Sequence, residues 1–220
     1  MLRRSTRSTR SAGSARFERS ARSVGVVAIV AVLLVSGCST GEGTPGGSPS
    51  RAAVSTTKPT AAPASSTHPI DAADAVQGKS GTYSVLPPQG WGDATDEVGA
   101  MPGVDLVIMS SEKQAGFNTN LVVHVATGDA ALLESELHKG REQLGDQGRT
   151  VSGAPPLTVG GSPATGFTTS FTQQGVEVVA RSYGLHHEGR VYLLTLSSAQ
   201  SAAEQAAAEL NEIAETWTWT

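Results

Sequence analysis

The stretch Val191–Leu196, with the sequence VYLLTL, decides the fold of this chain. Successive side chains of a strand point to opposite faces, and here both alternating sets are apolar. The segment 121–125, with the sequence LVVHV, has one fully apolar face and one that is nearly so. Strands of this kind are covered on both sides. We therefore expect a packing layer on each face of the sheet that contains them.

The segments around this stretch have the pattern of strands joined by tight turns. The triplets Gln-Gln-Gly at 173–175 and His-Glu-Gly at 187–189 separate three strand-like runs, 164–172, 176–185 and 190–197. Two-residue turns that contain glycine join antiparallel neighbours, so these three runs are expected to pair in sequence. Further strands are expected at 81–86, 104–109, 121–126 and 156–159.

Two helices are expected to supply the covering layers. Asp129 can cap a helix whose buried side carries leucines at helical spacing, Leu133, Leu137 and Leu144. Ser201, followed three residues later by a glutamate, matches a capping box and places the start of the second helix there. We predict an α+β domain: an antiparallel β-sheet with one helix packed on each face.

Several short motifs, taken in order, resemble a known family. A P-x-G-W element occupies 88–91, an aromatic residue and an asparagine lead into an aliphatic strand at 116–123, and the segments 159–164 and 189–195 follow. This order resembles the LpqN-type lipoproteins of actinobacteria and, more remotely, the PsbP-like α/β/α sandwich. The resemblance covers about residues 80–220. It implies a binding or accessory role outside the membrane and supplies no active-site residues.

The first 37 residues have the pattern of a lipoprotein signal peptide. Seven arginines precede a 12-residue uncharged apolar run, 24–35, which is shorter than the roughly 20 residues of a spanning helix. The run ends at VSGC, residues 35–38, which resembles the bacterial lipobox, and Cys38 is the only cysteine of the chain. We predict lipidation of the Cys38 thiol, removal of residues 1–37, and an anchor on the extracytoplasmic face of the cell membrane.

A tether is expected to separate this anchor from the fold. Of the 30 residues 39–68, 25 are Gly, Pro, Ser, Thr or Ala, which cannot bury a core. We therefore divide the chain into a signal peptide (1–37), a lipidated cysteine with a disordered tether (38–68), and a single domain (69–220). The Thr and Pro content of the tether is compatible with O-glycosylation.

The charge balance limits the partners of the mature chain. Without the seven arginines and the one glutamate of residues 1–37, it carries 9 basic and 19 acidic residues, a net charge of −10. Nucleic acids and anionic lipids are bound through basic patches, so neither is expected as a partner of this domain. The expected partners are the membrane, through the lipid anchor, and a protein or cell-wall component.

The sequence shows no recognisable catalytic or cofactor motif. It has no G-x-S-x-G, HExxH, Walker or dinucleotide-binding pattern, and one cysteine excludes both a disulfide framework and a cysteine-rich zinc site. We expect no enzymatic activity, no cofactor and no metal. His124, on a strand between apolar residues, is expected to be a hydrogen-bonded core residue.

Trp91 is the leading candidate for a contact residue. It follows a Pro-Gly turn and opens a loop that runs to Gly103. It is either an anchor at a contact surface, where tryptophan is enriched, or a plug at one end of the sandwich. Phe117, Asn118 and Asn120 are expected to line the nearby turn and are further candidates.

Three function classes are open at this point. The expected one is a non-enzymatic binding or accessory module, anchored to the membrane, for a protein or cell-envelope component. The alternative is a small-ligand or lipid-binding lipoprotein, which needs an internal cavity. The third is an envelope hydrolase, which needs a serine, His124 and an acid brought together by the fold.

Overall fold

The computed structural model of this chain describes residues 74–98 and 101–220. The expected signal peptide, the lipidation site Cys38 and the tether lie outside the described residues, so the predictions about them stay predictions. Within the described ranges, no helix combines the length and the apolar composition needed to cross a membrane.

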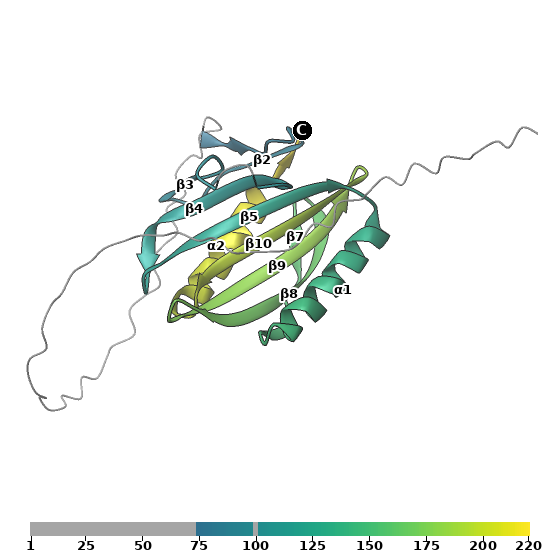
Figure 1. The fold of residues 1–220 in the computed structure, drawn as a ribbon. Helices are drawn as coiled ribbons and strands as arrows, with labels where there is room; N and C mark the ends of the chain where they lie inside the picture. The colour runs from purple at the N-terminus through teal and green to yellow at the C-terminus, as the bar shows by residue number, and fades with distance from the viewer. Residues whose placement is uncertain (1–73, 99–100) are drawn as a thin grey trace, which may run out of the picture.

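An antiparallel sheet of eight strands forms the centre of the domain (Figure 1). Its strands are β3 (Trp91–Asp93), β4 (Val104–Gln114), β5 (Phe117–Thr127), β6 (Thr150–Gly153), β7 (Leu157–Val159), β8 (Ser162–Gln173), β9 (Val176–His187) and β10 (Arg190–Ala199). The order across the sheet is β3-β4-β5-β10-β9-β8-β6, and β7 pairs with β8. A second sheet contains β1 (Val76–Gln77), β2 (Tyr83–Val85) and β11 (Thr218–Trp219), in the order β1-β2-β11.

The two helices, α1 (Ala130–Asp146) and α2 (Ala203–Thr216), pack on opposite faces of the central sheet (Figure 1). Strand β10 shows this directly. Val191 and Leu193 belong to the apolar cluster that contains the buried leucines of α1. Tyr192, Leu194 and Leu196 belong to the cluster that contains the buried side of α2. The predicted α+β arrangement, with both faces of this strand covered, is confirmed.

Type I′ turns join the last three long strands, as the glycine triplets predict. Gln174 and Gly175 have φ values of 51° and 82°, and Glu188 and Gly189 have 45° and 72°. Two consecutive residues with positive φ match the right-handed twist of the strands that they connect. β8, β9 and β10 therefore pair in sequence order.

Helix α1 begins at the predicted cap. The Asp129 carboxylate accepts a hydrogen bond from the Leu132 backbone N–H at 2.8 Å. The helix ends at Asp146, and Gly148 follows with a φ of 79°. Gly145 lies inside the last turn.

Replacing Asp129 with alanine is expected to lower the free energy of unfolding by about 1 kcal/mol, because the first turn of α1 loses its cap. Urea denaturation of the two proteins measures the difference. Asp146→Ala, at the other end of the same helix, is the matched control and should not destabilise the domain. Equal losses in both variants would contradict a capping role for Asp129.

The expected capping box at Ser201 is wrong. The chain leaves β10 through a 3-10 turn, η2 (Gln200–Ala202), and α2 begins only at Ala203. Ser201 lies inside this turn, so its hydroxyl does not occupy the N-cap position, and no side chain caps the helix. Helix α2 is held by the burial of one side instead, which includes Ala206, Leu210 and Ile213.

The end of the chain closes the α2 side of the domain through an aromatic cluster. Trp217 stacks on Tyr83 with ring centroids 4.1 Å apart, and Trp219 stacks on His187 at 4.0 Å. Tyr192 meets both tryptophans edge to face. These five residues, here called the aromatic clasp, join β2, β9, β10 and the C-terminal segment.

Candidate functional site

The central sheet opens between β8 and β9 at one end. Regular pairing of the two strands begins at the turn, where Gln173 pairs with Val176. It continues to the pair formed by Thr165 and Gly184 and stops there. Beyond this point, residues 162–164 of β8 pair with β7. Residues 185–187 of β9 pair with β10. The inner edges of these two three-residue segments therefore have no strand partner among the described residues.

Trp219 of the aromatic clasp spans this opening on the α2 face. Its Nε1 donates a hydrogen bond to the Gly160 carbonyl at 2.9 Å, in the turn between β7 and β8. The same indole stacks on His187 of β9. One side chain thus contacts β9 and the turn that leads into β8.

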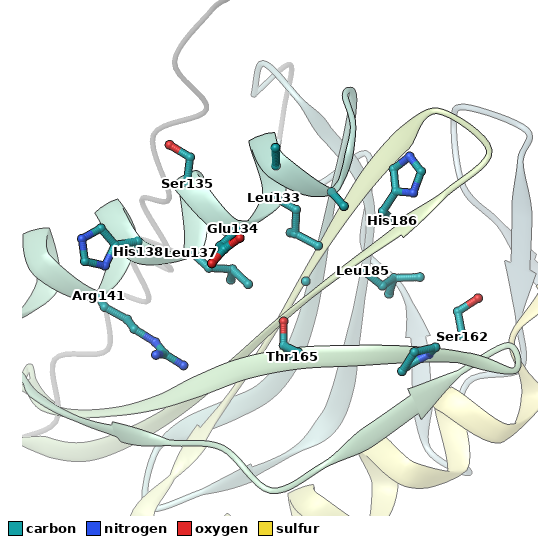
Figure 2. A pocket seen from close by; sticks show the side chains of 14 residues that line it. Leu133, Glu134, Ser135, Leu137, His138, Arg141, Ser162, Thr165, Leu185 and His186 are labelled. Carbon is teal, nitrogen blue, oxygen red and sulfur yellow. The ribbon is translucent and has the colours of Figure 1, made fainter.

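On the α1 face, the parted strands form one side of an open groove of about 1100 Å³, and α1 forms the other (Figure 2). Its apolar lining comes from Ala130, Ala131, Leu133 and Leu137 of α1, Pro163 of β8, and Gly184 and Leu185 of β9. The three leucines among them are buried. Polar side chains from three elements surround them: Glu134, Ser135, His138 and Arg141 of α1, Ser162 and Thr165 of β8, and His186 of β9.

Gly184 allows α1 to lie close to the sheet. A Cβ atom at this position would clash with the Leu133 side chain and would lie 3.2 Å from Leu137 Cδ1. The two leucines occupy the space above the glycine. The absence of a side chain at position 184 therefore determines how closely α1 packs on β9.

Arg141 is the cation of the groove. Its Nη2 donates a hydrogen bond to the Gly166 carbonyl at 2.6 Å, and its guanidinium carbon lies 5.4 Å from the centre of the Phe167 ring. No carboxylate of the described residues forms an ion pair with it. By contrast, His138 on the same helix lies 3.3 Å from Glu142. Arg141 is thus positioned by the sheet, and the residue is exposed.

Trp91, the leading sequence candidate, lies far from this groove, on the edge strand β3. It is half-buried, packs against the apolar cluster on the α2 side, and its buried Nε1 makes no hydrogen bond within the described residues. It pairs with Ser110 of β4. The Asn118 side chain donates to the Ser110 carbonyl at 2.9 Å, so the fold brings Trp91 and Asn118 to the same point of β4.

The expectation that Asn120 lines a turn is wrong. Strand β5 begins already at Phe117, so Asn120 lies inside the strand, where it is buried and donates to the Asn118 carbonyl at 2.9 Å. Its partner on β4 is Met109, the neighbour of Ser110, so its side chain points to the face opposite Trp91. None of the four sequence candidates lines the groove.

His124 is half-buried beside the backbone of Gly103. Burial lowers the pKa of its imidazole, and the Gly103 backbone acts in the opposite direction. The buried Nδ1 has no hydrogen-bond partner among the described residues, so the expectation of a hydrogen-bonded core histidine does not hold for this atom. Among all residues that the structure describes, no group of three or more His, Cys, Asp or Glu side chains is placed to hold a metal ion.

The lowered pKa of His124 predicts a loss of stability in acid. The unfolded chain binds a proton near pH 6.5, whereas the folded chain binds it only at lower pH. The contribution of neutral His124 is therefore complete above pH 6.5 and falls as the pH drops toward the folded pKa. Urea midpoints at pH 7.5 and 5.0 should differ less for His124→Gln than for the wild type. An unchanged difference would show that another group causes the acid sensitivity.

No protein-family model and no curated protein sequence matches this chain. Solved structures do have a similar fold. One is LpqN of Mycobacterium tuberculosis, described as involved in cell envelope biogenesis. The two chains are 18% identical, the match covers 63% of this chain and 83% of LpqN, and the TM-score is 0.45.

Two further similar structures come from other organisms. Cyanobacterial PsbP from Synechocystis sp. PCC 6803 is 17% identical, with 72% of this chain and 100% of PsbP covered and a TM-score of 0.47. The Ran-binding protein Mog1p of Saccharomyces cerevisiae is 14% identical, with 65% and 93% covered and a TM-score of 0.45. The structure is thus similar to LpqN and to cyanobacterial PsbP, which represent the families that the sequence motifs resemble. Since each TM-score is below 0.5, function is argued from the residues of this chain.

Proposed function

We propose that this chain is a lipoprotein anchored on the extracytoplasmic face of the cell membrane, and that its folded domain is a non-enzymatic binding module for a protein or cell-envelope component. The groove between α1 and the parted strands carries this proposal. It combines an apolar lining, made by Ala131, Pro163 and the small exposed parts of Leu133 and Leu137, with Arg141, which has no carboxylate partner among the described residues. Binding sites typically have this composition of apolar surface and a few placed polar groups.

The form of the groove favours a large partner over a small enclosed ligand. It is open along α1 rather than closed over, and its polar groups come from α1, β8 and β9 (Figure 2). An extended or protruding part of another molecule can reach all three elements at once. The alternative, a carrier of a small ligand or lipid, would need an enclosed volume.

The anchor follows from the lipobox-like segment that ends at Cys38. Each buried methylene of an acyl chain contributes roughly 0.8 kcal/mol, and two or more chains anchor stably. The tether of 30 residues then has a typical reach of roughly 30 Å, which holds the acidic domain away from the anionic membrane surface.

Metabolic labelling with an alkyne fatty acid tests the anchor. The wild type should be labelled, and its mature form should begin at Cys38. Cys38→Ala should lose the label and remain unprocessed. Ser39→Ala, the adjacent residue, is the matched control and should be labelled like the wild type. A label retained by Cys38→Ala would contradict this part of the proposal.

Photo-crosslinking in the native membrane tests the binding function. A benzophenone amino acid is placed at Thr165 in the groove, at Trp91, or at Ser152, an exposed residue of β6 outside the groove. We expect a discrete adduct from Thr165 and none from Ser152. An adduct from Trp91 alone would move the contact surface to β3. The absence of adducts at all three positions would contradict a stable partner.

A further inference from the structure

We propose that the groove binds an extended peptide segment of a partner protein, which adds as a strand beside β9 and places an acidic side chain at Arg141. This inference rests on the proposed binding function and names the chemical class of the partner. Three features of the groove carry it: its open strand edges, its length, and its charge.

The open edges provide main-chain hydrogen-bonding groups. Residues 185–187 of β9 pair on one side with β10, and no described strand pairs with their other side. An exposed edge of this kind recruits an extended peptide through its backbone N–H and C=O groups. Pro163, on the facing edge of β8, has no backbone N–H, so a complete β8–β9 ladder could not form there.

The opening is formed before any partner arrives. Trp219 lies across it on the α2 face, bonded to Gly160 and stacked on His187. Closing the two strands onto each other would require this indole to leave both contacts. A preformed site binds a ligand more tightly, because no part of the binding free energy is used to rearrange the protein.

The length of the groove matches a short segment. The residues of α1 that line it run from Ala130 to Arg141. At a rise of 1.5 Å per residue, this part of the helix is about 16 Å long. An extended chain of about five residues covers the same distance, at roughly 3.3 Å per residue. The part of it that can pair with β9 is limited to the unpaired edge at residues 185–187, and the rest lies over the paired strands toward Arg141. The alternate side chains of such a segment that face α1 would meet Ala131 and the small exposed parts of Leu133 and Leu137.

The charge of Arg141 selects the acidic end of the segment, whereas the other charged residue of the lining, Glu134, lies about two helical turns earlier on α1. Arg141 is fixed by the Gly166 carbonyl and the Phe167 ring and has no described carboxylate in contact. A guanidinium held in this way pairs with a carboxylate through charge-assisted hydrogen bonds. Arg141 lies at the end of the groove where β8 and β9 are still paired. The segment is therefore expected to carry Asp, Glu or its C-terminal carboxylate at that end.

A displayed library of random eight-residue peptides is the probe, selected against the mature lipidated chain in phosphatidylcholine nanodiscs. We expect enrichment of peptides with apolar residues next to an acidic one. The best of them should bind at least tenfold more weakly to Thr165→Trp, which fills the groove from an exposed position. Ser152→Trp, exposed on β6, is the matched control and should bind like the wild type. If Thr165→Trp fails to fold, Ala131→Trp fills the groove from the exposed side of α1.

Two chemical changes test the binding mode. N-methylation of alternate backbone amides of the peptide should weaken binding at least tenfold, because strand pairing loses its donors. Arg141→Gln should weaken binding of the acidic peptide but not of its Asn or Gln counterpart. Failure to enrich any peptide, equal binding by Thr165→Trp, or indifference to N-methylation would each overturn the proposal.

The two proposals fail in distinguishable ways. An adduct from Thr165 in cells, without a groove-specific peptide from the library, would leave the binding function standing and overturn the strand-addition mode. If the groove instead gave a photo-adduct with lipid and selected no peptide, the partner class proposed here would be wrong. The absence of both an adduct and a peptide would contradict both proposals.

Discussion

Replacing Trp217 with alanine is expected to lower the free energy of unfolding by about 3–5 kcal/mol, the usual cost of removing a buried tryptophan side chain. Trp217 is 4% exposed, stacks on Tyr83, and contacts Tyr192 and Trp219 edge to face. Its loss would leave a cavity between the small sheet and β10. It would also remove the stacking partner of Tyr83, which with Tyr192 is the largest of the fully buried side chains.

Urea denaturation of Trp217→Ala and Trp91→Ala gives this prediction a matched comparison. Both variants remove an indole, but Trp91 is only half-buried on an edge strand. Trp91→Ala should therefore cost clearly less than Trp217→Ala. Similar losses in the two variants would mean that Trp91 is as much a core residue as Trp217, which would weaken its candidacy as a contact residue.

Replacing Gly184 with valine is expected to destabilise the domain by about 1–3 kcal/mol, as overpacking of a close contact does. The new side chain would clash with Leu133 and force α1 away from the sheet. Thr165→Val is the matched control. It introduces the same side chain at the residue paired with Gly184, in the open groove, and should change stability little.

A double-mutant cycle separates this clash from any effect on the strand itself. Leu133→Ala alone removes a buried leucine and is expected to cost about 2–5 kcal/mol. If the clash is the cause, Gly184→Val should cost less in the Leu133→Ala background than in the wild type, with a coupling of at least about 0.5 kcal/mol. Strictly additive losses would show that α1 does not limit the side chain at position 184.

The long strands of the sheet and the helices that pack on its two faces could be predicted because they depend on local patterns. Both faces of Val191–Leu196 are apolar, and that alone requires a layer on each side of β10. The type I′ turns at Gly175 and Gly189 need residues that accept positive φ, so glycine marks them. Asp129 marks the start of α1 because a carboxylate at that position satisfies a free N–H of the first turn.

Two local patterns were misleading. Ser201 matches a capping box, but the chain enters α2 through a 3-10 turn that follows β10 directly. Asn120 follows other polar residues near a turn, but pairing with β4 extends the strand back to Phe117 and buries it. In both cases the neighbouring strand decided the local conformation, and its influence is absent from a short window of sequence.

The groove could not be predicted from any one segment. Its lining comes from α1, β8 and β9. It exists because β8 and β9 separate beyond the pair formed by Thr165 and Gly184. The only local signs are Pro163, which cannot complete a ladder, and the missing side chain at position 184. Neither sign indicates a groove until α1 is known to lie over that part of the sheet.

The sequential pairing of β8, β9 and β10, their turns, the presence of two helices and the acidic character of the mature chain follow from the amino-acid sequence alone, because alternation, glycine turns and charge are properties of neighbouring residues. The order of the strands across the sheet follows from the tertiary structure. The groove and the fixed position of Arg141 follow only from the tertiary structure. The Trp219 indole, which stacks on His187 of β9, bonds to Gly160, 59 residues earlier in the chain. Contacts over such distances depend on how whole elements pack, which short-range patterns do not specify.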